Sequence, residues 1–139
     1  MQTAIVILAA GKGTRMKSEM PKVLHEVAGA PLLMHCMKTA QTIDPEHLII
    51  VAGHGSDDVT KTARTYAPDS QIVTQSAQLG TAHAVAQSRE ILSGFEGDLI
   101  ILYGDTPFVR SETLGKLAQA RQKSDLVVLG FQANDPGRY

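Results

Sequence analysis

An uninterrupted apolar run that leads directly into a glycine-containing turn is the strongest constraint on the fold of this chain. Residues 4–8 (AIVIL) have the length of one β-strand and no polar position. This pattern is typical of a strand that is covered on both faces of a parallel sheet. The turn that follows contains Gly11 and Gly13, which allow positive φ angles and a close approach of backbone N–H groups to a ligand. The segment therefore predicts a buried first strand whose carboxyl end opens into a binding loop.

The rest of the chain alternates strand-like and helix-like segments. We expect strands at residues 4–8, 48–52, 71–75, 98–102 and 126–131. We expect helices at residues 31–42, 57–66, 81–92 and 112–122, with Pro31 at a first helical position and Ser56 and Ser111 as N-caps. This alternation, with right-handed crossovers, predicts an α/β fold with a mostly parallel sheet flanked by helices. In such sheets ligands bind beyond the carboxyl ends of the strands.

Three cationic side chains lie in or just after the glycine turn: Lys12, Arg15 and Lys22. The planar fork of arginine and the point charge of lysine both suit phosphoryl oxygens. The spacing differs from two familiar glycine motifs, because Met16 stands where a dinucleotide-binding turn has its third glycine, and Gly13 lacks the Lys-Ser/Thr that follows it in a P-loop. The turn therefore predicts a phosphate-binding loop of another kind, and the alternative is a turn whose glycines serve only the bend.

Two further segments follow predicted strands. Gln75 ends the third strand, and residues 78–83 (QLGTAH) open the next helix, offering amide groups for a base edge and free N–H groups at a helix N-terminus. Asp105 follows the fourth strand. Magnesium is usually held by one or two carboxylates together with phosphate oxygens, although an aspartate in a turn also caps its own backbone. With the glycine turn, these segments predict a site for a nucleoside triphosphate and Mg²⁺.

Composition excludes several other classes of protein. The 139 residues are 43% apolar and 19% charged, with a formal net charge of -1, which excludes a globally basic nucleic-acid binder. No apolar run has membrane-spanning length and no leader sequence is evident, so we expect a cytoplasmic protein without membrane insertion. Cys36 is the only cysteine, which excludes an internal disulfide, and its apolar helical surroundings predict a buried, unreactive thiol.

The five histidines give no catalytic or metal-binding pattern. They are scattered, without an H-E-x-x-H motif or a pair at metal spacing on one helix face. A nucleophile elbow with a Ser-His-Asp order is also absent, so covalent acyl chemistry is unsupported. We therefore predict no catalytic histidine.

Several motifs together resemble those of a bacterial family of bifunctional enzymes. They are residues 8–16 (LAAGKGTRM), 21–25 (PKVLH), Gln75, 78–84 (QLGTAHA) and 102–105 (LYGD). The first marks only the broad sugar nucleotidyltransferase superfamily, whereas PKVLH with QLGTAHA is more specific. The chain resembles the N-terminal uridyltransferase domain of the N-acetylglucosamine-1-phosphate uridyltransferase and glucosamine-1-phosphate N-acetyltransferase family. The resemblance implies a Rossmann-related, GT-A-like fold that is incomplete at the C-terminus, with residues 1–139 as the nucleotide-binding part of a sugar nucleotidyltransferase domain.

The resemblance also implies a Mg²⁺-dependent reaction of UTP with N-acetylglucosamine 1-phosphate. It yields UDP-N-acetylglucosamine, a precursor of peptidoglycan and lipopolysaccharide, and pyrophosphate. Backbone contacts to the nucleotide would come from Leu8, Ala9, Ala10 and Gly11. Uracil would be selected by Gln75, Gly80 and Thr81. The phosphates would be held, and their charge neutralised during catalysis, by Arg15 and Lys22. Ribose and metal would be approached by Tyr103, Gly104 and Asp105, with Asp105 as the Mg²⁺ ligand.

Members of this family continue well beyond the equivalent of residue 139. Their later strands cover the sugar and supply an asparagine to the metal, and a C-terminal left-handed β-helix transfers the acetyl group and forms a homotrimer. We therefore expect this chain to bind UTP and Mg²⁺ with little turnover. Two alternatives stay open: another nucleotidyltransferase that acts on a sugar phosphate or an alcohol phosphate, or a non-catalytic nucleotide-binding module.

Overall fold

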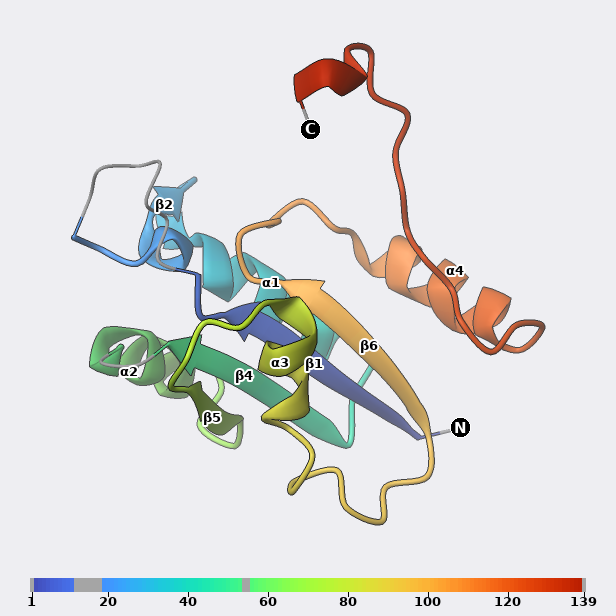
Figure 1. Cartoon of the computed structure of the whole chain (residues 1–139), viewed down its shortest axis with the longest axis horizontal. Helices are drawn as coiled ribbons and strands as arrows, with labels where there is room; N and C mark the ends of the chain where they lie inside the picture. The colour runs from blue at the N-terminus through green and yellow to red at the C-terminus, as the bar shows by residue number, and fades with distance from the viewer. Residues whose placement is uncertain (1, 12–18, 54–55, 139) are drawn as a thin grey trace.

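The main sheet has four parallel strands, with β1 and β4 inside. The computed structural model describes residues 2–11, 19–53 and 56–138. The sheet order is β5-β4-β1-β6, made of β1 (Thr3–Ala9), β4 (His47–Gly53), β5 (Gln71–Gln75) and β6 (Asp98–Tyr103). A short antiparallel pair is made of β2 (Glu26–Val27) and β3 (Ala30–Pro31). The helices are α1 (Leu32–Gln41), α2 (Asp57–Tyr66), α3 (Thr81–Ala86) and α4 (Ser111–Arg121), with the 3₁₀ turns η2 (Lys22–Leu24) and η3 (Pro136–Arg138) (Figure 1).

Both faces of the sheet are covered, which explains the uninterrupted apolar run of the first strand. Ile5 and Ile7 belong to a core cluster with side chains of α1, α2 and α4, including Leu33. Val6 points to the other face and packs in a second cluster with Ala84 of α3. Each of these five side chains is 4% exposed or less. The predicted α/β fold with a parallel sheet flanked by helices is therefore confirmed.

The strand order places a switch point beside β1. The chain moves from β1 to β4 and β5, and then returns across the sheet to place β6 on the other side of β1. Connections of the same hand that move in opposite directions put their helices on opposite faces, as α1 and α3 are here. The loops after β1 and β5 therefore lead to opposite faces of the sheet at its carboxyl edge, which is where α/β sheets bind ligands.

Two of the predicted elements are corrected by the structure. The segment 126–131 forms no strand, and its side chains Leu126, Val128 and Phe131 are 73–80% exposed. β-branched and apolar residues form a strand only where a neighbouring strand pairs with them and other side chains pack on them. No strand pairing in the described residues includes this segment.

The helix expected at 81–92 ends at Ala86. Beyond it the backbone makes tighter i to i−3 bonds, and the Ser88 hydroxyl donates to Val85 O at 2.6 Å, a local bond that competes with the helix.

The helix starts also differ in detail from the sequence prediction. Pro31 lies one position earlier than expected, as the N-cap of α1. Ser56 is the N-cap of α2, but its hydroxyl donates to Gly53 O and makes no capping bond to the helix. Ser111 is the first residue of α4, whose N-cap is Arg110. Asp57 and its neighbour Asp58 lie in the first turn of α2, where the helix dipole favours negative charge.

Gly97, directly before β6, provides a test of the packing at the amino end of the sheet. A Cβ atom there would overlap the Gln2 carbonyl oxygen and the Phe95 ring. We expect Gly97→Ala to lower the free energy of unfolding by about 1–3 kcal/mol, the usual cost of overpacking. Gly115→Ala in α4 is the matched control, because nothing lies within 4 Å of a Cβ there and alanine favours a helix by about 0.5–1 kcal/mol. Urea unfolding followed by circular dichroism should give shifts of opposite sign, and a shift of the same sign would contradict this packing.

Candidate functional site

A hollow of about 530 Å³ lies at the carboxyl ends of β1, β4 and β5. Its lining includes the ends of these strands and the residues just after them: Ala9, Ala10, Gly11, Gly53, Gln75 and Gln78. This is the edge of the sheet at which the sequence predicts the binding site. The hollow brings together the loop after the first strand and the loop after the third, which are more than 60 residues apart in the chain.

Close backbone contacts shape this hollow. A Cβ atom on Gly53 would lie 3.1 Å from Ala10 O, so the end of β4 approaches the glycine turn more closely than a larger residue would allow. Gln78 donates from Nε2 to the same Ala10 oxygen at 2.6 Å. The loop that follows β5 is therefore tied directly to the loop that follows β1.

The Gln75 side chain is buried at the base of the hollow. It is 4% exposed, although glutamine is usually a surface residue. Its Nε2 donates to Gly80 O at 3.2 Å and lies 2.9 Å from His83 Nδ1. Gly80 has a φ of +97° and is the N-cap of α3, which begins at Thr81. The structure thus places Gln75 beside Gly80 and the start of α3 at Thr81.

A second polar group lies between the loops after β1 and β6. Lys22 Nζ and Asp105 Oδ2 are 2.6 Å apart, and their side chains are 43% and 30% exposed. Gly104 fixes the position of this carboxylate, because its N–H donates to Leu8 O at 2.9 Å. A Cβ atom on Gly104 would lie 3.0 Å from that oxygen and 3.1 Å from Val23 Cγ1. The sequence alternative that Asp105 caps its own turn is not what the structure records, since the hydrogen bond of its carboxylate is with Lys22.

Cys36 contacts this turn, and the pKa of its thiol is raised. Its Sγ donates to Tyr103 O at 3.3 Å. Burial, with a smaller effect from the charge of Asp105, raises the pKa of the Cys36 thiol to about 11. The thiolate, which is the reactive form, is therefore scarce at neutral pH. The prediction of a buried, unreactive thiol is confirmed.

Charge divides the site into two parts. The described lining of the hollow carries two carboxylates, Glu19 and Asp58, and no cation. Sequence reasoning missed both acids, because nothing in the pattern connects them with the strand ends. Lys22 supplies the positive charge on the β6 side, whereas Arg15 and Lys12 lie outside the described residues. The hollow therefore disfavours an anionic group, and the Lys22–Asp105 side suits phosphate and metal.

The described residues of the chain supply only some of the ligands that a divalent cation needs. No group of three or more His, Cys, Asp or Glu side chains in residues 2–11, 19–53 and 56–138 is arranged to hold a metal ion. Asp105 alone offers a partly exposed carboxylate at a strand end. Mg²⁺ commonly binds with one or two carboxylates and completes its octahedron with phosphates and water. Asp105 therefore fits a cation that arrives together with a nucleotide.

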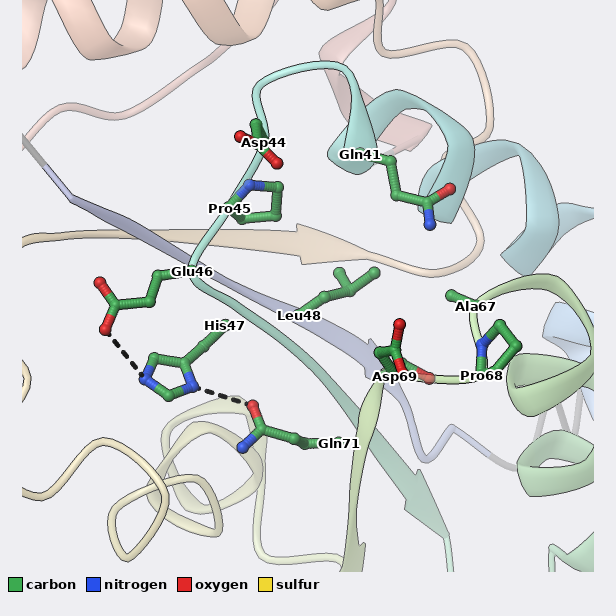
Figure 2. A pocket seen from close by; sticks show the side chains of 11 residues that line it. Gln41, Asp44, Pro45, Glu46, His47, Leu48, Ala67, Pro68, Asp69 and Gln71 are labelled. Atoms are coloured by element: carbon green, nitrogen blue, oxygen red, sulfur yellow. Dashed lines mark hydrogen bonds and ion pairs between the residues drawn. The ribbon is translucent and has the colours of Figure 1, made fainter.

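A second hollow, of about 550 Å³, lies at the opposite edge of the sheet. Figure 2 shows its acidic and amide side chains at the amino ends of β4 and β5. His47 contacts Gln71 Oε1 at 3.0 Å and Glu46 at 3.8 Å, so several of these groups pair with one another. None of the sequence-predicted site residues lines it. The carboxyl-edge hollow is the better candidate, because it contains the loops of the switch point.

Comparisons with known proteins agree with the fold. In the described part of the chain, no helix has the length and apolar character needed to cross a bilayer. The Bifunctional protein GlmU of Ruegeria sp. (strain TM1040) is 55% identical over 139 residues, which make up 100% of this chain and 31% of that protein. The chain thus spans less than a third of the length of this relative.

Solved structures share the fold at low sequence identity. HddC from Yersinia pseudotuberculosis superposes with a TM-score of 0.71 and 23% identity, covering 90% of this chain and 56% of that one. The manganese complex of Rv0371C from Mycobacterium tuberculosis H37Rv gives a TM-score of 0.63 and 22% identity, covering 86% and 59%. These likenesses confirm the Rossmann-related, GT-A-like fold. The family model of the MobA-like NTP transferase domain matches residues 5–137. The chain therefore belongs to the MobA-like NTP transferase domain family.

Proposed function

We propose that this chain is the nucleotide-binding part of an enzyme that transfers a uridylyl group from UTP to N-acetylglucosamine 1-phosphate and releases pyrophosphate. The observation that carries the proposal is the division of the carboxyl edge into two parts. A hollow lined by the buried Gln75 amide and the Lys22–Asp105 ion pair both lie at the carboxyl edge of the sheet. Such an arrangement suits a ligand with an uncharged base at one end and charged phosphates with a cation at the other.

The two parts of the site have separate roles in this proposal. Gln75, Gly80 and Thr81 bind the uracil, and the backbone from Leu8 to Gly11 supports the nucleotide between base and phosphates. Lys22, with Arg15, holds the phosphates and stabilises the negative charge that develops on the leaving pyrophosphate. Tyr103, Gly104 and Asp105 lie at the β6 strand end, toward the ribose and the cation. Mg²⁺, when bound, would neutralise phosphate charge. Positioning and electrostatic stabilisation account for most of the catalysis in such phosphoryl reactions.

Full-length relatives support the choice of substrates. The similarity to the Bifunctional protein GlmU extends over 100% of this chain, and the motifs around Gln75 and Lys22 are those that the sequence analysis connects with uridylyl transfer. We propose that the sugar side of the site and an acetyl-transferring, trimer-forming domain belong to the parts of such relatives that this chain does not span. Residues 1–139 alone are then expected to bind nucleotide and to turn over slowly.

Isothermal titration of the 139-residue chain with UTP, CTP and GTP, each with and without Mg²⁺, tests this proposal. We expect UTP to bind most tightly and only weakly without the cation. A pyrophosphate-release assay with N-acetylglucosamine 1-phosphate should show slow, UTP-dependent turnover. Tighter binding of CTP or GTP would assign another base and overturn the uridylyl proposal. Nucleotide binding that is indifferent to Mg²⁺ would favour a non-catalytic module.

A further inference from the structure

His83 contacts the amide of Gln75, which lines the hollow. The amide nitrogen of Gln75 has two neighbours, Gly80 O at 3.2 Å and His83 Nδ1 at 2.9 Å. His83 lies in α3 and is half-buried. The sequence analysis gave this histidine no role, because no pattern of spacing connects it with Gln75 eight positions earlier. The contact therefore connects the predicted site with a residue outside it.

The contact with Gly80 decides which end of the amide faces inward. A backbone carbonyl oxygen only accepts hydrogen bonds, so the Gln75 atom beside Gly80 O must be the nitrogen. A flipped amide would place two acceptor oxygens against each other. The same nitrogen then turns its second hydrogen toward His83 Nδ1, which must accept it. His83 Nδ1 is therefore the acceptor in this arrangement.

An amide nitrogen faces each ring nitrogen of His83, and a neutral imidazole accepts a hydrogen bond at only one of them. Gln87 Nε2 lies 3.3 Å from His83 Nε2, a longer contact than the 2.9 Å between Gln75 and Nδ1. The Gln87 nitrogen already donates to His83 O at 2.9 Å, so it does not depend on the ring as an acceptor. We assign the acceptor to Nδ1, because its contact is the shorter one and involves the more deeply buried amide.

Fixing the nitrogen leaves the Gln75 carbonyl oxygen as the group that a ligand meets. No hydrogen bond within the described residues engages Oε1 of Gln75, although Gln75 lines the hollow. An acceptor in this position pairs with a ring N–H, which uracil has at N3. Cytosine has an unprotonated N3, so the two acceptors would be left unpaired in a buried place, which is costly.

We propose that His83 is a positioning residue that sets base specificity, by holding the Gln75 amide with its oxygen toward the base so that uracil is preferred over cytosine. The proposal rests on the proposed uridylyl function. His83 does not touch the nucleotide in this arrangement and acts through Gln75 alone. Sites that hydrogen-bond a substrate group discriminate more strongly than apolar pockets, because the wrong ligand leaves buried polar groups unpaired.

Three variants of the 139-residue chain separate this role from a general structural one. His83→Leu removes the acceptor, and we expect the ratio of the Kd for CTP to that for UTP to fall about tenfold, the effect of one buried hydrogen bond. His83→Asn places an amide oxygen near the position of Nδ1 and should restore most of the ratio. Gln87→Leu removes the other neighbour of the ring and should leave the ratio unchanged. In all three variants the Kd for Mg²⁺-pyrophosphate should stay that of the unmodified chain, because pyrophosphate does not reach Gln75.

The results distinguish this inference from the function on which it rests. If the unmodified chain prefers UTP and His83→Leu keeps that preference, or weakens UTP, CTP and pyrophosphate alike, the positioning role is wrong and the uridylyl proposal stands. If the unmodified chain shows no preference for UTP, both are overturned. Nitrogen-15 chemical shifts of His83 in the ligand-free chain test the geometry without any nucleotide. A shift typical of an unprotonated Nδ1 supports the proposal, and a protonated Nδ1 overturns it, even if His83→Leu fails to fold.

Discussion

Asp105→Asn is expected to abolish most of the Mg²⁺ dependence of nucleotide binding while leaving the fold intact. The substitution keeps the size of the side chain and removes its charge. Loss of a metal ligand should cost at least the tenfold to hundredfold in metal affinity that is typical of residues supporting a ligand, and we expect about a hundredfold. Titration of UTP at fixed Mg²⁺ concentrations measures the effect, which should appear as a nearly flat dependence on the cation.

The ion pair with Lys22 explains why this variant should stay folded. Both side chains are partly exposed, and exposed ion pairs typically contribute about 0–1 kcal/mol to stability. Binding of nucleotide without Mg²⁺ should even improve slightly, since the variant no longer places a carboxylate beside the phosphates and leaves Lys22 unpaired. Asp125→Asn is the matched control, because Asp125 is an exposed residue that follows α4. A Mg²⁺ dependence that survives Asp105→Asn would show that the cation is held elsewhere.

Much of the sheet could be predicted because the polarity of successive residues reflects which faces of a strand are buried. Ile5 and Val6 point to opposite faces and are both fully buried, so an uninterrupted apolar run could only be a strand covered on both sides. The bounds of β5 were predicted in full. The segment 126–131 has the same kind of composition but is exposed. Composition indicates a propensity to form a strand, but it does not show whether a neighbouring strand is there to pair with it. Strand order is likewise a tertiary property, and only the structure shows that β6 lies beside β1.

The candidate site was predictable where a residue follows directly from a strand end. Asp105 and Gln75 meet this condition, and the structure places each at the carboxyl edge of the sheet. The Lys22–Asp105 contact joins residues 83 positions apart, and no pattern in the sequence predicts it. His83 could not be found in this way, because its importance depends on which atom of the Gln75 amide faces it. Side-chain orientation of this kind is fixed by hydrogen-bond geometry, which residue spacing does not encode.

Lys22→Met should weaken binding of UTP about a hundredfold, or by about 3 kcal/mol, the usual effect of removing one well-placed electrostatic group from such a site. Methionine retains the length and apolar stem of lysine and removes only the ammonium group. The loss should therefore be confined to ligands with phosphates, and the weak binding of uridine should be unchanged. Titrations with uridine, UMP and UTP measure this difference, which is also expected to shrink at high salt because the interaction is electrostatic.

The Lys22–Asp105 pair gives this variant a second, opposite signature. Lys22 Nζ lies 2.6 Å from one oxygen of the Asp105 carboxylate, so in the ligand-free chain the ammonium group competes with any cation for that carboxylate. Lys22→Met should therefore raise the affinity for Mg²⁺ alone, whereas Asp105→Asn should lower it. Lys61→Met, on the exposed surface of α2, should change neither UTP nor Mg²⁺ binding. Equal weakening of uridine and UTP by Lys22→Met would mean that the lysine supports the base end of the site, and the division of the carboxyl edge into base and phosphate parts would then be wrong.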